Sequence, residues 1–178
     1  MSQMLRGFVV LLAFALLSAG QRVVAQPDIA SAAAKLGIQK GIVAVLGFTE
    51  ADAQAVVNVA SSGGPRVYFQ SSDASAVKAV REAADKSQRL TVQVSADLGV
   101  LSSIHLSENL ADGVLVAESA ADQVSDAEVL RVLRPRGIAI IGERRIVRPV
   151  PDGIDDWSHP YHGPDNNPQS NDQLVKGA

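Results

Sequence analysis

Short apolar runs rich in β-branched residues alternate with alanine-rich amphipathic stretches along most of the chain. Most of these runs are almost continuously apolar, which is typical of parallel strands covered by helices on both faces. Residues 90–94 alternate between apolar and polar instead, so we expect this run at a sheet edge. The pattern predicts an α/β fold with a doubly wound, mainly parallel sheet. The expected strands are residues 42–46, 66–70, 90–94, 113–117 and 137–141.

The amphipathic stretches carry recognisable helix start and stop signals. Thr49 and Asp73 stand where an N-cap would open helices over residues 50–61 and 74–85. Ser125 with Glu128 forms a capping box for a helix that ends near residue 133. An earlier helix is expected at residues 29–36, before a glycine.

The first 25 residues have the features of a secretory signal peptide. Arg6 supplies a positive start, residues 8–17 form an apolar segment, and Ala25 ends a run of small residues suited to cleavage. A membrane anchor is the alternative, but crossing a bilayer takes about 20 apolar residues. We therefore expect cleavage after Ala25 and export to the periplasm or the extracellular space.

Charge and cysteine content narrow the classes of partner. The 178 residues include 16 Lys and Arg, 19 Asp and Glu and no Cys, with a formal net charge of −3. Removing the leader removes two arginines and no acid, so the charge becomes more negative. Nucleic acids and anionic membranes attract clustered Lys and Arg, so neither is an expected partner. The lack of cysteine excludes disulfides and thiolate chemistry.

The composition changes after residue 142. Three arginines, two prolines and a glycine lead into a segment, residues 155–170, that holds the only Trp and two of the three His. We expect one domain over residues 26–142, followed by a linker and an irregular C-terminal tail over residues 143–178. The arginines have two interpretations: an anion-binding cluster or the solvated face of a linker, of which the linker is favoured.

Histidines raise three chemical possibilities. His159 and His162, three residues apart and close to several aspartates, could bind a metal, but the neighbouring prolines disfavour a helix that would put both rings on one face. Packing and hydrogen bonding within the tail is the favoured interpretation, and we expect no metal. His105 lies near serines and an acid, but no nucleophile-elbow motif supports a hydrolase.

A helix-to-strand turn brings in a family resemblance. Residues 131–137 read Arg-Val-Leu-Arg-Pro-Arg-Gly, which resembles the turn hydrophobic-Leu-Lys/Arg-Pro-Gly-Gly of class I S-adenosylmethionine-dependent methyltransferases. The resemblance covers residues 41–142 and implies a Rossmann-like, methyltransferase-like fold. The loop at residues 46–51 then stands at the carboxyl end of the first strand, where such folds bind a cofactor. The site residues that the resemblance implies are Gly47, Phe48, Thr49, Glu50, Ser71, Asp97 and Glu118.

The chain departs from the family pattern at several of these positions. Val45 stands where an acid is usual, and Thr49 and Ala51 replace glycines that would let the backbone approach a ligand. The second strand ends in Gln70 and Ser71 instead of the acid that grips the ribose. We therefore expect an eroded site that binds S-adenosylmethionine weakly or not at all, in a non-catalytic module that binds a small molecule or a protein.

An active methyltransferase, with Asp97 near the adenine and Glu118 facing the substrate, is the alternative. Export argues against it, because S-adenosylmethionine is made in the cytosol.

The tail carries a second resemblance. The segment that starts Asp-Asp-Trp-Ser-His-Pro-Tyr-His at residue 155 is similar to a junction in large exported bacterial proteins, especially planctomycete ones. In those proteins a methyltransferase-like domain precedes a β-propeller of the pyrroloquinoline-quinone-binding type. The resemblance implies either a truncated product or a stand-alone descendant, and a fragment of a quinoprotein-like oxidoreductase is a further alternative.

Overall fold

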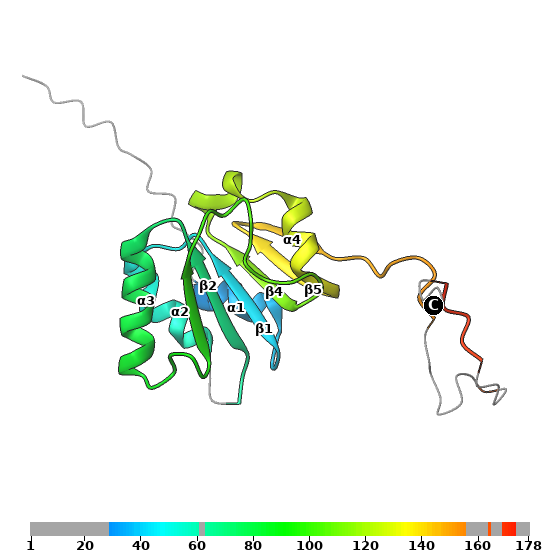
Figure 1. The fold of residues 1–178 in the computed structure, drawn as a ribbon, viewed down its shortest axis with the longest axis horizontal. Coiled ribbons are helices and arrows are strands. Elements are labelled where there is room, and N and C mark those ends of the chain that lie inside the picture. Colours follow the sequence, from blue (N-terminus) through cyan, green and yellow to red (C-terminus); the bar gives the residue numbers. More distant parts are fainter. Residues whose placement is uncertain (1–28, 61–62, 156–163, 165–168, 174–178) are drawn as a thin grey trace, which may run out of the picture.

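A six-stranded sheet forms the centre of the protein (Figure 1). The computed structural model describes residues 29–60, 63–155, 164 and 169–173. The strands are β1 (Ile42–Leu46), β2 (Arg66–Ser71), β3 (Val94–Leu98), β4 (Ala111–Val116), β5 (Leu133–Ile141) and β6 (Arg144–Val147). The helices are α1 (Ile29–Leu36), α2 (Ala53–Val59), α3 (Ala74–Lys86) and α4 (Asp126–Val132), with short 3₁₀ helices η1 (Glu50–Asp52) and η2 (Glu118–Gln123).

The strand order is β3-β2-β1-β4-β5-β6. All neighbouring pairs are parallel except β5 and β6, which are antiparallel. The chain builds β2 and β3 outward on one side of β1 and then returns to place β4 on the other side. This reversal between β1 and β4 is the topological switch point of a doubly wound sheet, and it confirms the predicted fold class.

The two faces of the sheet are covered differently. Helices α1, α2 and α3 pack side by side over one face, which holds Val43 and Phe69. The other face is covered by α4 and by the segment between β3 and β4, residues 99–110, which contains no helix. We call this segment the β3–β4 loop. Parallel sheets normally have helices on both faces, so the loop takes the place of a missing helix.

The predicted starts of α3 and α4 are confirmed, whereas the α-helix expected from residue 50 begins at Ala53, after the 3₁₀ turn η1. The Asp73 carboxylate accepts a hydrogen bond from the Ser75 backbone at 2.9 Å and opens α3. Ser125 Oγ accepts one from the Glu128 backbone at 3.2 Å and opens α4. At the third start, Thr49 donates to the Asp52 carboxylate from its backbone nitrogen and its hydroxyl. Side chains thus satisfy donors that helix starts leave without partners.

The third strand lies four residues later than the pattern predicts. Residues 89–93 form a turn in which the Gln93 and Val94 backbone nitrogens donate to the Arg89 carbonyl, and Thr91 has a φ of 63°. The turn places Leu90 beside Val94 as an isolated bridge and leaves Val92 exposed, so the alternation in the sequence does not mark a strand here. The edge position of this strand is confirmed, because β3 ends the sheet.

The sheet also continues past residue 142, where we expected a linker to begin. Strand β6 pairs with β5 directly after a tight turn. Arg144 donates to both carboxylate oxygens of Asp126 at 2.8 Å, and Arg148 donates to the carbonyls of Arg131 and Leu133. Two of the three arginines therefore connect β6 and its continuation to the domain.

The expected leader and most of the aromatic segment, including Trp157, His159 and His162, lie outside the described residues. On either side of that segment, the Asp155 carboxylate accepts hydrogen bonds from the Asn171 backbone at 2.6 Å and the Ser170 hydroxyl at 3.2 Å. Within the described ranges, no helix is long and apolar enough to cross a membrane.

Candidate functional site

The carboxyl edge of the parallel strands collects most of the predicted site residues. Leu46 of β1 is in register with Gln70 of β2 and Val116 of β4, and Gln70 is in register with Asp97 of β3. Gly47, Ser71 and Glu118 each follow or end one of these strands, so they lie along the same edge. This is where doubly wound folds bind ligands.

Gly47 approaches other parts of the protein closely. Its φ is 71°, which glycine adopts without strain. A Cβ at this position would lie 2.3 Å from the Cβ of Ala120 in η2 and 2.9 Å from Cδ1 of Leu101 in the β3–β4 loop. Both of these side chains are buried. The close approach that glycine allows is therefore used by the protein's own side chains.

Gln70 at the end of β2 is completely buried. Its amide nitrogen donates to the carbonyls of Val100 and Ser103, each at 2.8 Å. Its amide oxygen accepts from the His105 backbone at 2.9 Å and lies 3.2 Å from the Tyr68 hydroxyl. These bonds use the donors and acceptors of the amide, and three of them hold the β3–β4 loop against the sheet.

A second anchor holds the same loop from α4. Glu128 accepts a hydrogen bond from the Ile104 backbone at 2.7 Å, and it pairs with Arg131 at 2.7 Å. Arg131 donates to the carbonyls of Ile104 and Leu106 at 2.8 and 2.9 Å. The hydrogen bond from Arg131, together with that from Ile104, lowers the pKa of Glu128 despite partial burial.

Asp97 lies within β3, half exposed, and already has two partners. It accepts a hydrogen bond from the Tyr68 hydroxyl at 3.2 Å and pairs with Arg81 of α3 at 3.7 Å. Burial and the negative charge of Asp97 raise the pKa of Tyr68 well above its ordinary value. The tyrosine is thus a neutral hydrogen-bond donor at every physiological pH.

The remaining predicted residues differ in exposure. Phe48 is buried in the core, whereas Thr49 and Glu50 are exposed at the start of η1. Ser71 is buried, and its hydroxyl accepts from the Asp73 backbone at 3.2 Å. The exposed Glu118 carboxylate lies over Gly142 at the end of β5, where an added Cβ would meet it. Gly47, Ser71, Asp97 and Glu118 therefore lie along the carboxyl edge, whereas the Phe48 side chain is buried in the core.

The sequence did not point to the residues that fill this edge. Leu101 and Ala120 carry no motif, Arg131 was singled out only as the first residue of the family turn, and Glu128 was predicted only as part of a capping box. Gln70 had a usable signal, because an amide at the end of a buried apolar strand must find partners inside the protein. In the part of the chain that the structure describes, no three His, Asp or Glu side chains are grouped as metal ligands.

Solved structures share this fold. A putative S-adenosyl-L-methionine-dependent methyltransferase from Methanococcus maripaludis matches 62% of this chain and 51% of its own, with a TM-score of 0.52 and 14% identity. The MccD protein matches 63% and 50%, with a TM-score of 0.52 and 15% identity. A geranyl diphosphate methyltransferase matches 62% and 41%, with a TM-score of 0.51 and 13% identity.

The matched region thus spans about half or less of each solved structure. No family model and no curated protein matches the sequence. The structural matches show that the fold is Rossmann-like and methyltransferase-like, as the resemblance implied.

The packing around Gly47 can be tested by exchanging a methyl group. We expect Gly47→Ala to lower the free energy of unfolding by about 2–4 kcal/mol, because a left-handed backbone and overpacking both cost stability. In the double variant with Ala120→Gly, part of that loss should be recovered. Urea denaturation of the two single variants and the double variant measures this coupling.

Gly37→Ala is the matched control, because Gly37 has a φ of 66° but no atom within 4 Å of an added Cβ. Only the backbone cost of about 1 kcal/mol should appear there. Equal losses at the two glycines, or strictly additive effects of the Gly47 and Ala120 changes, would contradict the packing described.

The Glu128 anchor predicts a particular dependence of stability on pH. The folded state lowers the pKa of this carboxyl group, so its stabilisation is complete above the unfolded value and is lost as pH falls through the folded value. Glu128→Gln should be less stable than the wild type at pH 7, and the two curves should converge below about pH 4. Denaturation across pH 3–7 checks this, with Glu82→Gln, at an exposed position of α3, as the control. A difference in stability between Glu128→Gln and the wild type that stays constant with pH would argue against the anchor.

Proposed function

We propose that the chain is an exported methyltransferase-like module that has lost its S-adenosylmethionine site and acts as a non-catalytic binding or interaction unit. The observation that carries the proposal is the packing of Leu101 and Ala120 against Gly47. At this turn a ligand would need to approach the backbone closely. Two buried apolar side chains occupy the space that such a ligand would need.

The chemistry of the neighbouring residues supports the same proposal. Gln70 stands where the family's ribose-binding acid is expected, and its amide is occupied by the β3–β4 loop. Asp97 is engaged by Tyr68 and Arg81. A ligand that used the buried Gln70 amide would have to displace its bonds to the loop, and each buried polar group left without a partner costs about 1–3 kcal/mol.

The proposed compartment is consistent with a lost cofactor. S-adenosylmethionine is a cytosolic metabolite, so an exported protein is under no requirement to keep a site for it. The further proposal, that the module belongs with a pyrroloquinoline-quinone-type propeller, rests on the tail segment that begins at Asp155. In that setting the domain supports or recognises a partner instead of carrying out methyl transfer.

Calorimetry tests the loss of the cofactor site. We expect no saturable heat when S-adenosylmethionine or S-adenosylhomocysteine is titrated into the folded protein, which corresponds to dissociation constants above about 1 mM. The physical reason is that Leu101 and Ala120 occupy the approach to Gly47. Micromolar affinity for either compound would disprove the proposal.

A variant with Leu101→Ala and Ala120→Gly distinguishes closure from loss of binding groups. Measurable affinity in this variant alone would identify the two side chains as the block. If this variant still unfolds cooperatively but gives no binding heat, the missing acid and glycines are enough to abolish binding.

Export predicts that the mature protein begins at Gln26. N-terminal sequencing and intact mass of the protein purified from its native host check this, and recovery from the cytosol with Met1 still present would contradict export. The same mass measurement tests the propeller context, because a mass far above that of this chain is expected if the sequence continues into a propeller.

A further inference from the structure

A groove lies on the sheet face that the β3–β4 loop covers only in part. It consists of two adjoining hollows of about 220 and 420 Å³ at the amino ends of β1 and β2 and the turn before β3. The residues that line both hollows are Ile42, Arg66, Val92 and Gln93. This is the opposite end of the strands from Gly47, so the groove is separate from the site discussed above.

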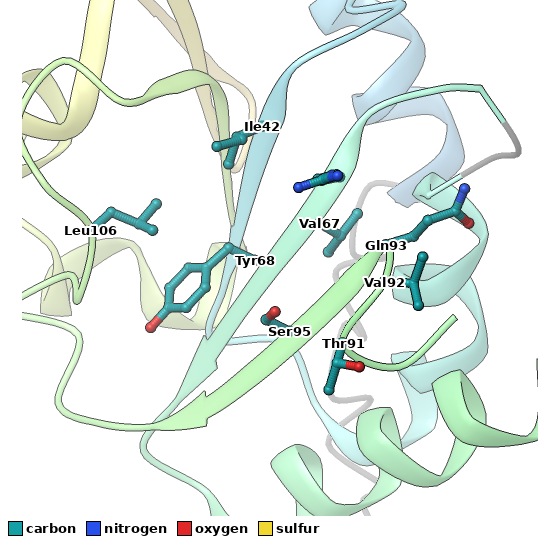
Figure 2. Close-up of a pocket in the computed structure, with 9 residues that line it drawn as sticks. Ile42, Val67, Tyr68, Thr91, Val92, Gln93, Ser95 and Leu106 are labelled. Carbon is teal, nitrogen blue, oxygen red and sulfur yellow. The ribbon is translucent and has the colours of Figure 1, made fainter. Parts of the chain in front are cut away.

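One side of the groove is apolar. Figure 2 shows Tyr68 and Ile42 on neighbouring strands, with Leu106 of the β3–β4 loop beside them. Val92, on the turn before β3, also lines the groove and is 65% exposed. The Tyr68 hydroxyl is engaged with Asp97, so the tyrosine offers the groove its ring surface rather than a free polar group.

The other side of the groove is cationic. Arg66 lines both hollows and Lys40 lines the larger one, while no acidic residue lines either. Neither cation has an ion-pair partner among the described residues. Asp112 lies over Gly41, which lines the larger hollow, but it is held by Arg134 and by the Ile42 backbone nitrogen.

We propose that this groove binds a small organic anion, a carboxylate or phosphate attached to a flat apolar body. Lys40 and Arg66 would pair with the anionic group, and the apolar body would lie against Ile42, Tyr68 and Leu106. Charge complementarity is the argument: two unpaired cations meet in a hollow without acids, on a protein whose net charge is −3.

The occupant is a small molecule because the groove has the size and the mixed lining of a ligand pocket. The proposal does not depend on whether the S-adenosylmethionine site is lost, because the two places lie at opposite ends of the strands.

Indole-3-acetate and its neutral amide, indole-3-acetamide, form a matched pair of probes. We expect indole-3-acetate to shift the backbone amide NMR signals of Arg66, Tyr68 and Ser95 in a saturable manner. Indole-3-acetate should bind about two- to fivefold more tightly than the amide, since an exposed ion pair contributes up to about 1 kcal/mol. Affinity for the acid alone should fall as salt is raised.

Charge removal gives the matched variants. Arg66→Gln and Lys40→Gln should each weaken binding of the acid about two- to fivefold and leave binding of the amide unchanged. Arg145 is an exposed arginine on β6, at the far edge of the sheet. The control variant Arg145→Gln should change neither the binding of the acid nor that of the amide.

Each of the following results would overturn the proposal: equal affinity for acid and amide, equal effects of Arg145→Gln and Arg66→Gln, or shifts centred away from the groove. Added S-adenosylmethionine should not displace indole-3-acetate. Displacement would assign the probe to the carboxyl edge, which would overturn both this proposal and the loss of that site.

Discussion

The buried amide of Gln70 is the interaction on which the carboxyl edge of the sheet depends. A side-chain amide without partners in the core would cost several kcal/mol, so the chain around it must supply them. The partners are the backbone groups of Val100, Ser103 and His105. These contacts fix a loop that has no internal helix and bury Leu101 and Ile104 beneath it. The pair Glu128 and Arg131 then ties the middle of the loop, at Ile104 and Leu106, to α4.

The same fold features that build a ligand site elsewhere have a structural use in this chain. The switch point between β1 and β4 leaves an opening at the ends of the strands, and glycine lets a neighbour approach the backbone. Leu101 and Ala120 supply that neighbour from within the protein. Both side chains are buried, so this part of the edge belongs to the core.

Local signals in the sequence were sufficient for most of the fold. Apolar runs gave β1, β2, β4 and β5, and capping residues such as Asp73 and Ser125 gave the starts of α3 and α4. The error at β3 has a local cause, because residues 90–94 alternate in the sequence like a strand but the chain turns at Thr91 before β3 begins. The contacts of Gly47 with Leu101 could not be predicted, because the β3–β4 loop has no periodicity and the two residues are far apart in the chain. The departures at Val45, Thr49 and Gln70 were visible in the sequence, but the side chains that pack at this edge were not.

A single structural change accounts for both the closed edge and the open groove. A helix in the crossover from β3 to β4 would lie along the sheet and cover the strands from their amino to their carboxyl ends. The loop that replaces it is drawn to the carboxyl ends by Gln70 and Glu128, so it covers that region closely. Little of it remains to cover the amino ends, where only Leu106 reaches the hollow beside Ile42 and Tyr68. The crossover without a helix therefore packs closely over the carboxyl ends of the strands and leaves a hollow at their amino ends.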